Sequence, residues 1–97
     1  MNQPNDHMNQ MHKAVEIISL ARMSPGQAGM IVQIDGGRGL SSRLDGLGIR
    51  VGKKITKVSG QLMRGPVLLR QDNIQVALGF GMACRVLVEV PRRADRK

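Results

Sequence analysis

The sequence has almost no aromatic residues: Phe80 is its one Phe, and Trp and Tyr are absent from the 97 residues. SH3 barrels that bind proline-rich peptides use a groove lined by aromatic side chains. Proteins that bind single-stranded nucleic acid usually stack the bases on aromatic side chains. The first mode of recognition is therefore excluded and the second is disfavoured. The core has to be aliphatic, with some of the seven Met residues as filler.

Side chains for catalysis are equally scarce. The two histidines, His7 and His12, stand in a polar N-terminal stretch, which gives a His-dependent nucleophile or general base no scaffold. The four carboxylates between residues 21 and 91 are spread over predicted turns and strands, at Asp35, Asp45, Asp72 and Glu89. No pair of them has to converge, so we predict that the protein is not an enzyme and has no small-molecule substrate.

Cysteine and long apolar runs are also lacking. Cys84 stands alone, so no internal disulfide can form and nothing indicates an oxidised, secreted scaffold. We expect its thiol to be structural and buried or half-buried. No apolar run approaches the roughly 18–20 residues of a membrane span, and the first residues lack the basic start and apolar stretch of a signal peptide. We therefore expect a cytoplasmic protein.

Positive charge is what the sequence has in excess. The formal net charge is +8 and the pI is about 11.2. Apart from a cluster at Lys53, Lys54 and Lys57, the basic residues are scattered. This distribution favours a generally basic surface that meets an acidic protein or a membrane-proximal partner. Direct binding of nucleic acid is the less favoured interpretation.

We interpret residues 1–14 as a disordered polar tail, rich in Asn, Gln and Met and without periodicity. Its side chains that can bind soft or borderline metals are His7, Met8, Met11 and His12. A high-affinity amino-terminal copper site would need His at the third position, where Gln3 stands. We therefore assign no metal site and no cofactor. Residues 92–97 form a second, basic tail.

Short β-branched and apolar runs, separated by turn residues, predict strands through the rest of the chain. We expect strands at 17–20, 30–34, 53–58, 67–70, 74–78 and 85–90, single helical turns at 21–23 and 79–84, a polar loop at 59–64, and a tight hairpin turn at 71–73. Residues 15–20 fit a helix equally well, because periodicity cannot decide over so few residues.

The stretch from 36 to 52 predicts one inserted helix of about two to three turns. Leu40, Leu44 and Leu47 follow the i, i+4, i+7 spacing that places them on one helix face. Ser42 and Asp45 form a weak capping box near the expected start. This face needs a sheet to lie on, so the helix should plug a small sheet or barrel.

Glycines mark both ends of this helix. Vicinal Gly36 and Gly37 allow a tight turn on entry, and the GGRG run lacks the spacing of a phosphate-binding loop. Gly48 can adopt the left-handed conformation that ends a helix, with Ile49 folding back as its hydrophobic contact. Gly46 falls inside the predicted helix, where another residue would be about 1 kcal/mol better, so we interpret it as a site of close packing.

Together these patterns predict a mainly β domain over residues 15–91, a small SH3-like barrel. We expect about five to six antiparallel strands, one inserted short α-helix and one or two helical turns.

Several short motifs stand in order between Ile18 and Val90: ISL at 18–20, PG at 25–26, GGRG at 36–39, RLDGLGI at 43–49, VGKKI at 51–55, GPV at 65–67, AL at 77–78 and GMA at 81–83. In this order and spacing they resemble the FeoA proteins of bacterial ferrous iron uptake. The resemblance implies an SH3-like barrel with an inserted helix. It also implies a non-catalytic accessory role, docking at the cytosolic GTPase region of the FeoB iron transporter, with the membrane reached only through that partner.

For this role we expect partner contacts on the helix and its flanks, at Arg38, Arg43, Leu47 and Arg50, with Lys53 and Lys54 as steering charges. Phe80 is a second candidate contact, because a lone aromatic between two glycines is a poor core residue; a role in capping the barrel end is equally favoured. The alternative function is a basic SH3-like module that associates with RNA or the ribosome. Open strand edges also allow a homo-oligomer.

Overall fold

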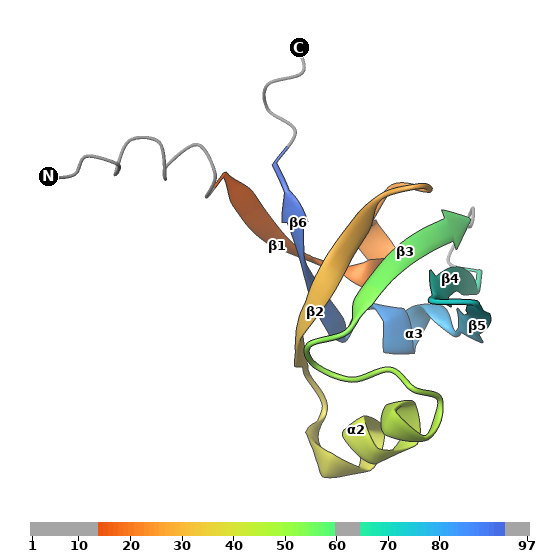
Figure 1. The fold of residues 1–97 in the computed structure, drawn as a ribbon. Helices are drawn as coiled ribbons and strands as arrows, with labels where there is room; N and C mark the ends of the chain where they lie inside the picture. The colour runs from red at the N-terminus through yellow and green to blue at the C-terminus, as the bar shows by residue number, and fades with distance from the viewer. Residues whose placement is uncertain (1–13, 60–64, 93–97) are drawn as a thin grey trace, which may run out of the picture.

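The computed structural model describes residues 14–59 and 65–92 (Figure 1). The tail predicted for residues 1–14 lies outside this part except for Ala14, and so does the basic tail after Arg92 and most of the loop predicted at 59–64. The described elements are β1 (Val15–Ser19), the 3-10 helix η1 (Leu20–Arg22), β2 (Ala28–Ile34), α2 (Gly37–Gly46), β3 (Lys54–Ser59), β4 (Val67–Gln71), β5 (Ile74–Leu78), α3 (Phe80–Ala83) and β6 (Val86–Pro91).

The strands form one antiparallel sheet of six strands in the order β1-β6-β2-β3-β4-β5. The sheet curves strongly, and α2 is inserted between β2 and β3 at one end of it (Figure 1). The mainly β class and the inserted helix are thus confirmed. The helical alternative for residues 15–20 is wrong, because Val15 to Ser19 pair with β6 along their whole length.

Most strand boundaries lie within two residues of the prediction. The main difference concerns Gln71. This residue was expected in the hairpin turn, yet it is the last residue of β4 and is only 7% exposed. Its register partner is Ile74, which leaves a two-residue turn of Asp72 and Asn73, with Asp72 at a φ of 57°. Asp tolerates this left-handed conformation better than most residues.

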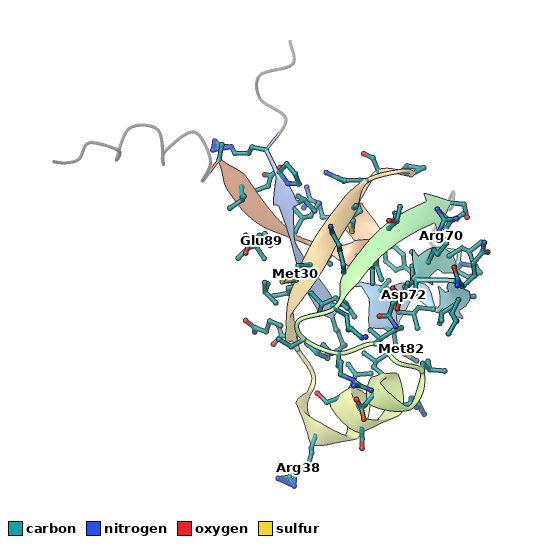
Figure 2. The ribbon with its side chains drawn as sticks, viewed as in Figure 1. Met30, Arg38, Arg70, Asp72, Met82 and Glu89 are labelled. Carbon is teal, nitrogen blue, oxygen red and sulfur yellow. The ribbon has the colours of Figure 1, made fainter. Side chains whose placement is uncertain are left out.

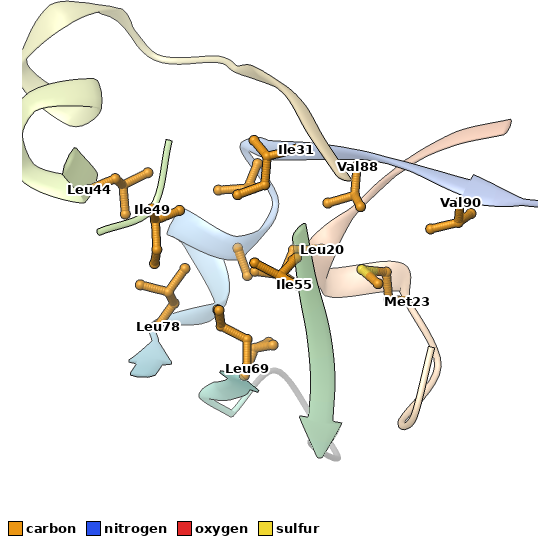
Figure 3. Close-up of a cluster of buried hydrophobic side chains, with 13 residues drawn as sticks. Leu20, Met23, Ile31, Leu44, Ile49, Ile55, Leu69, Leu78, Val88 and Val90 are labelled. Carbon is orange, nitrogen blue, oxygen red and sulfur yellow. The ribbon is translucent and has the colours of Figure 1, made fainter. Parts of the chain in front are cut away.

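The core is aliphatic, as the missing aromatics require. It consists of the buried residues Leu20, Met23, Ile31, Leu44, Ile49, Ile55, Val67, Leu69, Leu78, Ala83, Val86, Val88 and Val90. Figure 3 shows these side chains gathered between the inner face of the sheet and the short helical segments, with Leu44 and Ile49 at the α2 end. Alternation along β6 places Val86, Val88 and Val90 on one face of the sheet, and all three are fully buried.

Helix α2 begins at the glycines rather than at a capping box. Gly36 is the N-cap, and no side chain forms a hydrogen bond that caps the helix start. Gly36 and Gly37 have φ values of 144° and 83°, which L side chains rarely adopt. The capping role predicted for Ser42 and Asp45 is therefore wrong, because both lie in the body of the helix, which starts five residues before Ser42.

The C-terminal end of α2 follows the prediction. Gly48 has a φ of 86°, and its amide donates to the Asp45 carbonyl at 2.9 Å. The Ile49 amide donates to the Leu44 carbonyl at 2.9 Å, which completes a Schellman motif. Leu44 and Ile49 are fully buried, whereas Leu47 is the C-cap and is 45% exposed. The apolar face of α2 is thus Leu44 with half-buried Leu40, and Leu47 does not belong to it.

Gly46 is not a site of close packing, since a Cβ placed there would meet no atom within 4 Å. Gly46→Ala should raise the free energy of unfolding by about 0.5–1 kcal/mol, because alanine restricts the unfolded chain and favours the helix. Gly48→Ala should lower it by about 1 kcal/mol, because φ is 86° there and the new Cβ would lie 3.1 Å from Gln71 Nε2. Urea unfolding of both variants checks the pair; a loss of stability in Gly46→Ala would contradict this account.

Cys84 also differs from the expectation. It is the C-cap residue of α3 and it is exposed, not buried. The single turn of α3 directs Ala83 into the core and leaves the next side chain in solvent.

The most unusual buried side chain is Lys57, which is 2% exposed. It shares the inner face of β3 with Ile55, as the alternation of this strand predicts. Its Nζ donates to the carbonyl oxygens of Ala21 and Met23, at 3.0 and 2.7 Å. A buried cation therefore holds the end of η1 and the residue after it against β3.

Candidate partner-binding surface

A polar stripe on α2 faces away from the core. Arg38, Ser41, Ser42 and Asp45 follow the i, i+3, i+4, i+7 spacing, which places them on one side of the helix. Together with Ile34, Arg50 and Val51 they line a shallow groove of about 320 Å³, which we call the α2 groove. Figure 2 shows Arg38 extending from α2 into solvent, away from the sheet.

The wall of the α2 groove opposite the helix is held by backbone hydrogen bonds to β2. The Ile31 amide donates to the Lys53 carbonyl at 2.9 Å, and the Gly52 amide donates to the Ile31 carbonyl at 2.8 Å. The Lys53 amide donates back to the Arg50 carbonyl at 3.2 Å. Arg50 and Val51 therefore stand on a loop that the sheet fixes in place, so the groove is largely preformed.

Charge in the α2 groove is positive but partly paired. Arg50 Nε lies 2.8 Å from Asp45 Oδ1, with the side chains 56% and 57% exposed. Exposed ion pairs contribute about 0–1 kcal/mol, so Arg50 can exchange this partner for another carboxylate at little cost. Arg38 has no ion pair within the described residues. The groove thus offers two guanidinium groups to an incoming anion.

The predicted contact residues do not all meet here. Arg38 and Arg50 come together in the α2 groove, where Val51 exposes 58% of its surface. Leu47, the C-cap of α2, is 45% exposed but does not line the groove. Arg43 is exposed but lies about 140° around the helix from Arg38, because each helical residue turns by roughly 100°. It belongs to the far edge of α2.

Both steering lysines lie off the groove. Lys53 is half-buried in the loop before β3. Lys54 is exposed on the outer face of the sheet, opposite Met30 in the register, and lines a different hollow of about 330 Å³ with Met30 and Glu89. Met30 and Glu89 lie side by side on that face (Figure 2). Phe80 is half-buried at the start of α3.

Sequence reasoning missed the serines and Val51. The spacing of Arg38, Ser41, Ser42 and Asp45 could have indicated the serines, because it repeats with the period of a helix and defines a polar face opposite the apolar one. Val51 carried no signal, because its position depends on the hydrogen bonds between the following residues and β2.

Two further observations concern metals and membranes. Within residues 14–59 and 65–92, no three His, Cys, Asp or Glu side chains come together as a metal site would require. The candidate ligands His7, Met8, Met11 and His12 lie outside the described residues. In the same described ranges, no helix has the length and apolar character needed to cross a bilayer.

Comparison with known proteins gives a consistent result. Residues 18–90 match the family model of the FeoA domain. Over 70 residues the chain is 33% identical to the Fe(2+) transport protein A assigned in Methanocaldococcus jannaschii, covering 72% of this chain and 83% of that protein.

Solved structures agree with this match. The crystal structure of an iron uptake regulatory protein, FeoA, superposes with a TM-score of 0.69 at 29% identity, over 77% of this chain and 99% of that one. FeoA of Stenotrophomonas maltophilia, solved with zinc and described as a prokaryotic SH3 domain protein, has a TM-score of 0.64 at 20% identity, over 77% of this chain and 98% of that one. The second likeness shows the fold alone, and it confirms the predicted SH3-like class.

Proposed function

The chain belongs to the FeoA domain family of ferrous iron transport, and from that premise we propose that it is a non-catalytic accessory protein that binds the cytosolic GTPase region of a FeoB-type iron transporter and modulates it. The observation that carries this proposal is the family match over residues 18–90. The α2 groove supports it by offering a preformed docking surface on the segment that is inserted into the barrel.

The chemistry of the α2 groove fits an acidic patch on the partner. Arg38 and Arg50 each present a planar guanidinium that can bind a carboxylate through two parallel hydrogen bonds. Ser41 and Ser42 add hydroxyl groups that donate to the same carboxylates. The net charge of +8 would also speed the encounter with an acidic surface.

Exposed aliphatic side chains on α2 and the loop after it would supply the apolar part of the contact. Leu47 and Val51 are among the large apolar residues that the fold leaves exposed, at 45% and 58%. Interfaces generally combine an apolar centre with a polar rim. Here Val51 would supply the apolar centre, and Arg38 and Arg50 would supply the rim. Leu47 and Arg43 would contact a partner that also reaches the other side of α2, while Lys53, Lys54 and Phe80 do not line the groove.

The test is reversal of charge in the α2 groove. Arg38→Glu combined with Arg50→Glu should weaken binding to the isolated GTPase region about 30-fold, which corresponds to roughly 2 kcal/mol. The matched control is Arg70→Glu combined with Arg92→Glu, which changes the net charge equally at exposed positions away from α2 (Arg70 is labelled in Figure 2). Titration calorimetry at two salt concentrations measures both. Equal losses in the two variants would reduce the role of the groove to general electrostatics and refute this assignment.

The net charge alone favours a second candidate, an RNA- or ribosome-associated module. Such binding would weaken steeply with salt, because each phosphate contact releases counterions. A short RNA titrated alongside the GTPase region distinguishes the two functions. Binding to RNA at physiological salt, without binding to the GTPase region, would favour the alternative.

A further inference from the structure

Strand β1 lies at one edge of the sheet. It has a neighbouring strand, β6, on one side, and none on the other among the residues that the structure describes (Figure 1). Natural sheets usually protect such an edge with Lys, Pro or a bulge. Residues 15–19, VEIIS, contain neither Lys nor Pro, and their register with β6 runs without a bulge.

The direction of the backbone groups along this edge follows from two hydrogen bonds. The Arg92 amide donates to the Ala14 carbonyl at 2.9 Å, and the Asp35 amide donates to the Arg85 carbonyl at 2.8 Å. In an antiparallel ladder, successive residues point their N–H and C=O groups to opposite neighbours. The even-numbered residues of β6 therefore bond to β1, and the odd-numbered residues face β2.

The same alternation applies to β1. Glu16 and Ile18 pair with Val90 and Val88, so their backbone groups point to β6. The backbone groups of Val15 and Ile17, and the amide of Ser19, therefore point outward from the sheet. An extended strand laid along this edge would find a ready row of donors and acceptors.

Apolar side chains accompany these open backbone groups. Val15 and Ile17 expose 39% and 58% of their surface on the outer face of the sheet. Ile17 lies in one row with Glu89 on β6 and Met30 on β2, and Met30 is 46% exposed. An incoming strand would thus gain both hydrogen bonds and apolar contacts at β1.

We propose that β1 is a self-pairing edge, which joins β1 of a second copy of this chain in an antiparallel arrangement across a two-fold axis at Ile17. In this register Ile17 exchanges both backbone hydrogen bonds with Ile17 of the second copy. Val15 lies opposite Ser19 of the second copy, whose amide meets the free Val15 carbonyl. The two sheets then continue as one, and the two Ile17 side chains cover each other.

Charge favours a second copy at this edge. Although the chain carries a net charge of +8, residues 15–19 contain Glu16 as their single charged residue. In the proposed register Glu16 lies opposite Ile18 of the second copy, so no like charges stand directly opposite each other. The paired segment therefore contains no lysine or arginine, in a chain whose net charge of +8 would otherwise oppose self-association.

The other edge, β5, is less suited to pairing. Its register with β4 across a two-residue turn makes Gln71 and Ile74 a hydrogen-bonded pair, so the open amides belong to Gln75 and Ala77. Ile74 is 58% exposed, like Ile17, but its backbone faces β4. At β5 the exposed apolar residue and the open backbone groups therefore do not coincide.

Sedimentation velocity of the full chain tests the proposal, over about 10–500 µM because so small an interface binds weakly. We expect a monomer–dimer equilibrium whose dissociation constant rises at least about tenfold in Ile17→Lys, since a lysine on an edge strand opposes pairing. Ile74→Lys is the matched control and should leave the constant unchanged. A protein that stays monomeric, or a dimer broken by Ile74→Lys instead, would overturn the proposal.

Amide hydrogen exchange gives a second readout that is specific to this geometry. In dilute protein, the amides of Glu16 and Ile18 should exchange slowly and that of Ile17 quickly. At high concentration the Ile17 and Ser19 amides should become protected as well. Protection of Ile17 that does not depend on concentration would mean that the chain covers its own edge, and would refute self-pairing. Because α2 lies at another part of the fold (Figure 1), this result is independent of binding to the GTPase region.

Discussion

Replacing Gly29 by alanine should lower the free energy of unfolding by about 3 kcal/mol, the upper range for overpacking a well-packed site. Gly29 is buried in β2, where the strand crosses β6 closely. A Cβ at this position would lie 2.5 Å from the Glu89 carbonyl oxygen and 2.6 and 2.7 Å from methyl groups of Val88 and Val90. The oxygen belongs to the backbone of β6, which lies between β1 and β2 in the sheet, so a rotamer change cannot relieve that contact.

The matched control is Ala28→Val, one residue earlier in β2 at an exposed position. It adds more volume than Gly29→Ala but should change stability by less than about 0.5 kcal/mol, because surface sites tolerate substitution. Thermal unfolding measures both variants, and a loss of 3 kcal/mol corresponds to a drop in Tm on the order of 15 °C in a domain of this size. An unchanged Tm in Gly29→Ala would mean that β2 and β6 do not approach as closely as the structure shows.

Lys57→Ala should lower the free energy of unfolding by roughly 3 kcal/mol. The variant loses the buried aliphatic stem and leaves the carbonyl oxygens of Ala21 and Met23 without their donor. Lys57→Met keeps most of the stem but has no ammonium. The difference in stability between the two variants therefore measures the packing of the stem, and the difference between Lys57→Met and the parent measures the hydrogen bonds. Urea denaturation measures both; a Lys57→Met variant as stable as the parent at neutral pH would show that the two hydrogen bonds contribute nothing net.

The pH dependence of stability tests the same residue independently. Burial disfavours the charged ammonium and lowers the pKa of Lys57 from its ordinary value of 10.5. Between the lowered pKa and 10.5, the unfolded chain binds more protons than the folded chain, so the free energy of unfolding contributed by this group rises with pH. Compared with Lys57→Met, the parent should therefore gain stability as the pH approaches 10.5. If the parent instead lost stability relative to Lys57→Met over this pH range, the pKa of Lys57 would not be lowered by folding.

The sequence was sufficient for features that depend on local pattern. Alternation placed Val86, Val88 and Val90 inside, and Gly48 with Ile49 predicted the end of α2 correctly, because both rest on neighbouring residues. Alternation along β3 also places Lys57 on the inner face with Ile55, but the partners of its ammonium were not predictable in this way. Its ammonium bonds to carbonyl groups 34 and 36 residues away, and no local pattern brings η1 to β3.

The candidate site was predictable only in part. Arg38 and Arg50 were selected from the sequence, and the structure brings both to the α2 groove. Arg43 and Lys54 were selected with them, but their places depend on where α2 begins and on which sheet face Lys54 occupies. Because α2 already begins at Gly37, Arg38 and Arg43 belong to one helix, and its turn of roughly 100° per residue carries Arg43 to the far edge. The register of β2 with β3 places Lys54 beside Met30 instead.

The most direct test of the proposed function is amide NMR of the labelled protein, titrated with the cytosolic GTPase region of a FeoB-type transporter. We predict chemical shift changes concentrated on residues 34–53, which contain α2 and the loop that completes the groove, and absent from the Arg38→Glu, Arg50→Glu variant. The amides of β1 should not respond to the GTPase region. Changes confined to the sheet edges, or no change at concentrations that saturate weak complexes, would contradict docking through the α2 groove.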